Sequence, residues 1–245
     1  METAPGALST LEDDQRQGQA NLLELRARLG PVSLISQQTK SNAALRTLPD
    51  AIAPLAPLLP MGGVQRGWSI GVDGSGRWSL AMSLTGWLMG VDGWMSAVGV
   101  EDLGLVGAGE QGVPLERVLM VETPPPDKWA TVVAALIEAV HVVCVNPFHP
   151  VGRQDARRLQ ARAREQQAVL VHLDGGRTWP YPVDLALTGR QQQWEGLGQG
   201  FGHLRSRRIL AEVGGRRAPG PGHWAELHLP AVDSSPFAAE TESTR

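Results

Sequence analysis

The sequence predicts an α/β fold, with a mostly parallel central sheet flanked by helices and a β-hairpin near the C-terminus. After Gly62-Gly63, short apolar segments alternate with segments of helical length, which is typical of parallel strands joined by crossover helices. Further on, two extended segments flank a turn-rich stretch over residues 214–222, as in a hairpin. The 245 residues are enough to bury one sizeable core.

The first 54 residues are expected to form a helical extension ahead of the core. Leucines recur at helical spacing among charged residues over residues 11–29, and Gly30-Pro31 supplies a stop, so we expect an amphipathic helix there. Residues 45–60 are apolar but contain many prolines, which argues against one continuous helix. The domain boundary is therefore placed between residues 54 and 55.

The core is expected over residues 55–230, followed by a disordered tail over residues 231–245. Its elements follow from apolar periodicity and turn signals. In chain order they are a strand at 68–72, a helix at 79–89, a strand at 94–100, a short strand within 113–121, a helix at 128–139, a buried strand at 141–145, an arginine-rich helix at 153–167, strands at 168–173 and 183–188, and hairpin strands at 205–213 and 223–229.

Composition argues against several classes of function. The formal net charge is −3, so overall basicity does not indicate nucleic-acid binding. The single cysteine, Cys144, permits no disulfide within the chain, and the six histidines show no zinc-binding spacing, so we expect no metal site. There is no signal-peptide pattern and no run approaching the roughly 20 apolar residues of a membrane span. We expect a soluble, cytoplasmic protein without a membrane partner.

One segment has the glycine frame of a phosphate-binding P-loop but not its catalytic side chains. The degenerate loop comprises Gly71, Gly74, Ser75, Gly76, Arg77, Trp78 and Ser79. Gly71 and Gly76 fit the spacing G-x-x-x-x-G-K-[ST], but Arg77 takes the lysine position and Trp78 that of the magnesium-binding hydroxyl. Ser79 lies one position too late, and an indole offers no oxygen to Mg²⁺. The segment either binds a nucleotide without efficient hydrolysis or is a glycine turn between a strand and a helix.

Two arginine-rich groups are candidates for binding DNA or an acidic partner. One lies on the expected helix at 153–167 and the other in the terminal hairpin; the candidates are Arg153, Arg157, Arg158, Arg162, Arg205, Arg207 and Arg208. Clustered arginines suit phosphates, but a solvated helix with internal ion pairs or a charged sheet edge gives the same pattern. Trp194 and Trp224 are both candidate hot spots for a protein partner.

The order of elements resembles the RecA-like recombinase core over residues 55–230. Residues 97–103 are similar to the strand that ends in that family's catalytic glutamate, and Glu101 matches this position. Residues 141–146 are similar to the Walker B strand, but Asn146 replaces its closing aspartate. With the loop lysine and hydroxyl also replaced, the resemblance implies a core retained for its shape, with vestigial Walker positions. We therefore expect no catalysis and no cofactor, with ATP disfavoured.

Several short segments resemble the bacterial ImuA group, especially its short ImuA′ branch. They are the eroded loop, Asp102-Leu103-Gly104-Leu105, Asp155-Ala156-Arg157-Arg158-Leu159 and Trp194-Glu195-Gly196-Leu197-Gly198. ImuA proteins are accessory proteins of the damage-inducible mutasome. The resemblance implies a non-catalytic adaptor that links an ImuB-like Y-family homologue to an error-prone C-family DNA polymerase, associated with the nucleoid when DNA is damaged. DNA and RecA are further candidate partners. The alternatives are a slow or switch-type ATP-binding protein and a regulator of recombinase or cell-division proteins.

Overall fold

A computed structural model describes residues 48, 50–90, 92–101, 103–173, 179–197, 202–220 and 222–230. The amphipathic helix expected at residues 11–29 and the tail expected at residues 231–245 lie outside the described residues. Within the described part of the chain, no helix combines the length and the apolar character needed to cross a bilayer.

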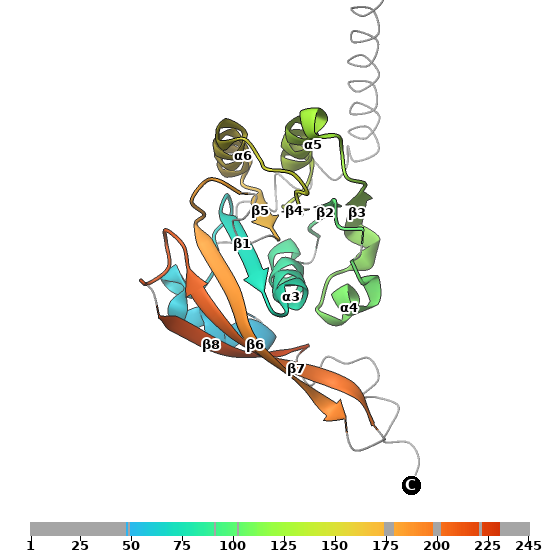
Figure 1. Cartoon of the computed structure of the whole chain (residues 1–245), viewed down its shortest axis with the longest axis vertical. Helices are drawn as coiled ribbons and strands as arrows, with labels where there is room; N and C mark the ends of the chain where they lie inside the picture. Colours follow the sequence, from blue (N-terminus) through green and yellow to red (C-terminus); the bar gives the residue numbers. More distant parts are fainter. Residues whose placement is uncertain are drawn as a thin grey trace, which may run out of the picture.

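The described elements alternate along the chain as the apolar periodicity predicts (Figure 1). In order they are η1 (Asp50–Leu58), η2 (Pro60–Gly62), β1 (Ser69–Gly74), α3 (Arg77–Met89), β2 (Met95–Val98), α4 (Leu105–Glu110), η3 (Leu115–Arg117), β3 (Val118–Val121), α5 (Pro126–Ala139), β4 (Val142–Val145), α6 (Arg153–Gln166), β5 (Val169–His172), β6 (Leu185–Leu197), β7 (Gly202–Gly214) and β8 (His223–Leu229). The short elements α4 and η3 were not expected, and α3 begins two residues earlier than expected.

The strands form one mixed sheet in the order β3-β2-β4-β5-β1-β6-β7-β8. Neighbours from β3 to β6 are parallel, whereas β7 is antiparallel to both β6 and β8. The expected α/β fold with a mostly parallel sheet is confirmed, and so is the terminal hairpin. Because β1 to β5 are parallel, the loops that follow them leave from one edge of the sheet, which we call the carboxyl edge.

Helices cover both faces of the parallel part of the sheet. On β4, Val142 and Cys144 belong to the apolar cluster shared with α3 and η1, whereas Val143 and Val145 belong to the cluster shared with α5 and α6. Figure 1 shows α5 and α6 side by side. Burial on both faces explains why β4 is continuously apolar rather than alternating.

The segment before β1 packs into the core although prolines interrupt it. Pro54 and Pro57 lie inside η1. This element is a 3-10 helix, in line with the expectation that the prolines prevent a continuous α-helix. Its Ile52 and Leu55 are buried, and η1 lies against β8. The element spans the domain boundary that we placed between residues 54 and 55.

The strand β6 is much longer than the strand expected at residues 183–188. It pairs with β1 from Leu185 to Gly189 and then continues to Leu197 beside β7 alone. Figure 1 shows this part of β6 and β7 as a two-stranded arm that extends past the other strands. Trp194 therefore lies in the arm, on β6, which pairs with the first strand of the expected hairpin.

A buried carboxylate joins the start of β1 to the C-terminal strands. Asp184 accepts hydrogen bonds from the Ser69 amide at 3.0 Å, from the Ser69 hydroxyl at 3.1 Å, from Arg216 at 2.9 Å and from Arg217 at 3.2 Å. Arg164 at the end of α6 lies 4.0 Å from the same carboxylate. Burial alone would raise the pKa of Asp184, but the Ser69 hydrogen bonds and the two arginines hold this pKa below its ordinary value.

We expect Asp184→Asn to lower the free energy of unfolding by about 3 kcal/mol at pH 7, because it leaves clustered arginines without their buried counter-charge. A carboxyl group with a lowered pKa stabilises the fold above its unfolded pKa and loses this contribution as pH falls through the folded pKa. The wild type should therefore lose stability below about pH 4, and the variant should show a shallower pH dependence. Urea unfolding from pH 7 to pH 3 measures both effects.

The matched control is Asp155→Asn, which removes an exposed carboxylate 3.3 Å from Arg158. An exposed pair contributes little, so we expect a change below about 0.5 kcal/mol. Equal effects of the two substitutions would contradict the role assigned to Asp184.

Candidate functional site

The P-loop-like segment forms a tight turn rather than an open loop. Gly71 to Gly74 belong to β1 and pair with β6, with Gly74 opposite Gly189. Only Ser75 and Gly76 connect β1 to α3, and Gly74 and Gly76 have φ angles of 76° and 72°. Such angles favour glycine, so the turn itself requires these two residues.

The long strand β6 closes this turn from the side. The Ser75 amide donates a hydrogen bond to the Gly189 carbonyl at 2.8 Å, so one amide that would face a phosphate is already bound. A Cβ at Gly74 would overlap the Gly189 carbonyl, and a Cβ at Gly189 would overlap the Ser75 carbonyl. The two backbones are therefore in direct contact.

The remaining glycines of the frame also have packing reasons. A Cβ at Gly76 would overlap the end of the Ile209 side chain, which comes from β7. At Gly71 a Cβ would lie 2.8 Å from the His172 ring. Close contacts within the fold thus account for the glycine spacing without a phosphate.

The side chains at the start of α3 interact with one another and with the arm. The Arg77 guanidinium lies 5.6 Å from the centre of the Trp78 ring, and Trp78 packs against the core. Arg207 of β7 donates a hydrogen bond to the Ser79 hydroxyl and lies 4.6 Å above the Trp194 ring. The structure thus brings the loop together with Arg207 and Trp194, a grouping that the sequence analysis missed.

The two vestigial Walker residues also lie at the carboxyl edge of the sheet, but they follow strands other than β1. Asn146 follows β4, and Glu101 follows β2, where its exposed carboxylate accepts a hydrogen bond from the Thr123 hydroxyl at 3.1 Å. At strand spacings near 4.8 Å, β4 lies roughly 10 Å from β1 and β2 roughly 14 Å from it. Glu101 is therefore directed toward the β3 side and not toward the turn.

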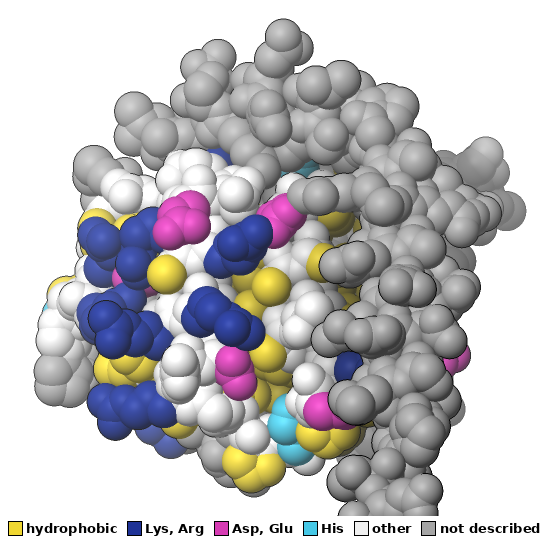
Figure 2. All heavy atoms as spheres, turned by 90° about the horizontal axis from the view of Figure 1, so that it is seen from above, with side chains coloured by type: hydrophobic (Ala, Val, Ile, Leu, Met, Phe, Trp, Pro, Cys, Tyr) yellow, Lys and Arg dark blue, Asp and Glu magenta, His cyan; other side chains and the backbone are white. Residues whose placement is uncertain are grey.

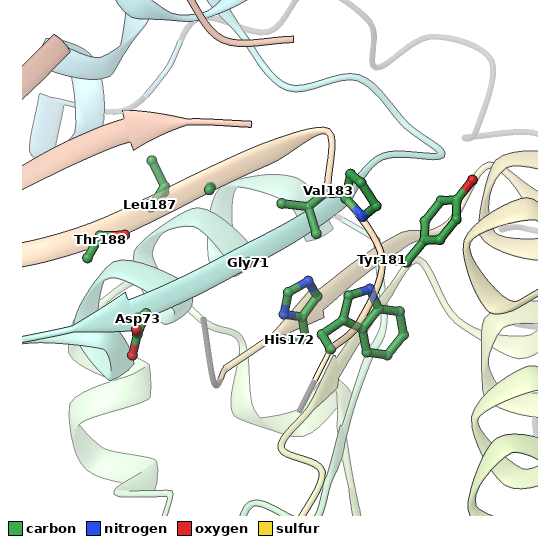
Figure 3. A pocket seen from close by; sticks show the side chains of 10 residues that line it. Gly71, Asp73, His172, Tyr181, Val183, Leu187 and Thr188 are labelled. Atoms are coloured by element: carbon green, nitrogen blue, oxygen red, sulfur yellow. The ribbon is translucent and has the colours of Figure 1, made fainter. Parts of the chain in front are cut away.

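A pocket of about 140 Å³ lies beside β1, and the sequence analysis did not find it. Figure 3 shows Asp73 and Thr188 at one end of the pocket, and His172 and Tyr181 at the other. His172 stacks on Trp179 with ring centres 4.8 Å apart. Ligand pockets for drug-sized molecules start near 300 Å³, so this space is too small for a nucleoside triphosphate.

The candidate arginines divide between paired and exposed positions. On α6, Arg158 pairs with Asp155 and Arg162 pairs with Glu138 of α5, whereas Arg153 and Arg157 are exposed. In the arm, Arg208 contacts Gln193 and Glu226. Arg205 lies in β7, but its side chain is outside the described residues.

Two candidate nucleophiles, Ser69 and Cys144, are buried in the core. Residues 67–71 match the spacing G-x-S-x-G of a nucleophile elbow, which the sequence analysis overlooked, but Ser69 is buried at the start of β1 with its hydroxyl on Asp184. Burial raises the pKa of Cys144 to about 12, so its thiol is not activated. Among the described residues, no group of three histidines, cysteines or carboxylates is placed to hold a metal.

We expect Gly189→Ala to destabilise the fold by more than about 3 kcal/mol, because the new methyl group would overlap the Ser75 carbonyl and part β6 from the turn. Urea unfolding followed by tryptophan fluorescence measures this change.

Gly107→Ala is the control for the glycine substitution, since a Cβ there meets open space on α4. It should leave stability unchanged or raise it by up to about 1 kcal/mol through helix propensity. If Gly189→Ala is as harmless as Gly107→Ala, the close contact between β6 and the turn is not required.

Comparison with known proteins places the chain in a family. The model of the MT3502 N-terminal domain matches residues 57–181, just over half of the chain, from the segment before β1 to the segment after β5. A protein of Mycobacterium tuberculosis, named uncharacterized protein Rv3395c, is 33% identical over 102 residues, which are 41% of this chain and 50% of the relative. The chain thus spans about half the length of this curated relative. The match over residues 57–181 shows that the chain belongs to the MT3502 N-terminal domain family.

Proposed function

We propose that the protein is a non-catalytic RecA-like adaptor of a damage-inducible translesion synthesis complex, in which it links an ImuB-like protein to an error-prone C-family DNA polymerase. One observation carries the non-catalytic part of this proposal: the turn between β1 and α3 is closed by Gly189 and Ile209. A triphosphate needs free amides, a compact cation and a magnesium ligand at this point. In the closed turn the Ser75 amide is already bound to Gly189, and Arg77 and Trp78 supply neither a compact cation nor a magnesium ligand.

The arrangement of the strands supports a RecA-like ancestry. The turn follows β1, Asn146 follows β4 and Glu101 follows β2, all at the carboxyl edge, with β5 between β1 and β4. These are the relative places that the resemblance assigns to the loop, the Walker B residue and the catalytic glutamate. The family match supplies no activity, so the identity of the partners rests on the resemblance.

The arm supports a role in binding another protein. Trp194 is 47% exposed, and Arg207 stacks on its ring and bonds to α3, so the indole is held in place while one part of it faces solvent. Rigid, half-exposed tryptophans are frequent anchors at protein interfaces. The arm lies beyond the rest of the sheet, where a partner can reach it (Figure 1).

Nucleotide binding is tested by thermal unfolding with and without millimolar Mg-ATP. A ligand at about 100 times its Kd adds about 2.7 kcal/mol, which corresponds to roughly 5–10 °C for a chain of this size. We expect a shift below about 1 °C. We expect the same result for Arg77→Lys combined with Trp78→Thr, because restoring the side chains does not move Gly189 or Ile209. A large shift in either protein would favour the ATP-binding alternative.

The adaptor role is tested by titrating the full chain with purified ImuB-like protein at physiological salt. We expect direct binding, and we expect Trp194→Ala to raise Kd at least about tenfold, as for an interface anchor. Trp224→Ala is the control, because Trp224 is similarly exposed at 43% but does not stack on Arg207. Its Kd should change less than about threefold. Absence of binding by the unmodified protein would reject the adaptor proposal.

A further inference from the structure

The arginines of α6 lie on two different flanks of the helix. Its inner face is defined by the buried residues Ala156, Leu159, Gln160 and Ala163. At about 100° per residue, Arg153, Arg157 and Arg164 fall on the flank next to Gln160, whereas Arg158 and Arg162 fall on the opposite flank. The opposite flank faces α5, since Arg162 pairs with Glu138.

The Gln160 flank faces the segment that leads into β6. The Gln160 amide donates a hydrogen bond to the Pro182 carbonyl at 3.3 Å, and Arg164 lies 4.0 Å from Asp184. Asp184 also binds Arg216 and Arg217, which follow β7. The tertiary structure therefore brings the α6 arginines next to two arginines from a distant part of the chain.

Positive charge exceeds negative charge on this surface. The Asp184 carboxylate, which is only 3% exposed, lies within 4.0 Å of three guanidinium groups. The side chains of Arg164, Arg216 and Arg217 are 51%, 40% and 49% exposed. Within the described part of the chain, no ion pair holds Arg153 or Arg157. Each guanidinium has five N–H donors, so donors beyond those bound by Asp184 can face solvent.

The space-filling view agrees with this division. In Figure 2, basic side chains gather at the left of the face that is seen from above, whereas basic and acidic side chains alternate nearer its middle. The whole chain has a net charge of −3, so the positive surface is a local feature.

We propose that the arginine surface, formed by Arg153, Arg157, Arg164, Arg216 and Arg217, binds the phosphate backbone of duplex DNA without reading its sequence. The proposal does not depend on the adaptor role, since it concerns a surface away from the arm. Arginine forks match phosphate oxygens, and Asp184 already orients two of them by hydrogen bonds, with Arg164 4.0 Å away. From Arg153 to Arg164 the helix rises about 16 Å, and each DNA strand carries a phosphate every 3.4 Å or so along the axis.

A duplex fits this surface better than a single strand. Single-strand binding relies on exposed aromatic rings on which bases stack. The indoles beside the surface are buried: Trp68 lies under Arg217, and Trp179 stacks on His172. With the Arg217 guanidinium lying over a buried indole, the surface suits backbone contacts better than base stacking.

The test measures binding of the full chain to a labelled 20-base-pair duplex of arbitrary sequence by fluorescence anisotropy over a range of salt concentrations. We expect log K to fall linearly with log salt, with a slope of about −4.5 for five contacts. Arg153→Gln combined with Arg157→Gln should weaken binding about tenfold or more at low salt and reduce the slope by about 2. No ion pair with another described residue holds these two arginines, so the fold should tolerate the change, which a thermal melt verifies.

Arg158→Gln combined with Arg162→Gln is the matched control, because it removes the same charge from the same helix on the opposite flank. It should change affinity less than about threefold. Equal losses in the two double variants would show a general charge effect and overturn the proposal, as would no duplex binding at low salt. Tighter binding of the same-length single strand would assign the surface to single-stranded DNA and also overturn it.

Discussion

The buried carboxylate of Asp184 is the interaction on which the rest of the arrangement depends. It joins the first residue of β1 to the segment before β6, and its arginine partners follow β7 and end α6. A buried charge without partners would cost several kcal/mol, so the segments that supply its partners must assemble together. This requirement holds β6 beside β1 in the register that pairs Gly74 with Gly189.

That register gives the glycines of the phosphate-loop pattern a packing role of their own. Once Gly189 lies opposite Gly74, its carbonyl accepts a hydrogen bond from the Ser75 amide and excludes a Cβ from Gly74, while the Ser75 carbonyl excludes a Cβ from Gly189. Ile209 does the same at Gly76 through β7. Glycine is required wherever backbone approaches another group closely, whether that group is a phosphate or a neighbouring strand. A glycine spacing alone therefore does not distinguish the two, and the distinction comes from what occupies the adjacent space.

The parts of the structure that the sequence predicted are those with local causes. Apolar runs located the buried strands such as β4, and the turn-rich segment before β8 located the hairpin. The length of β6 was missed because Arg190 and the glutamines after it resemble a loop, and only pairing with β7 extends the strand. The role of Asp184 was not predictable either, since Ser69 lies 115 residues away along the chain. The arginines of α6 were visible as a group, but their division into two flanks depends on Glu138 and Asp184.

Asp184 contributes both to the stability of the fold and to the order of the arginine surface. Asp184 compensates one of three positive charges and hydrogen-bonds to Arg216 and Arg217, so part of the entropy cost of ordering these two side chains falls on folding rather than on binding. Arg153 and Arg157 extend this ordered group along α6, from its C-terminal end toward the carboxyl edge. The closed turn and the arginine surface are thus separate consequences of one buried ion cluster: the first places β6 and β7 against the glycines of that turn, and the second leaves excess positive charge on the flank of α6.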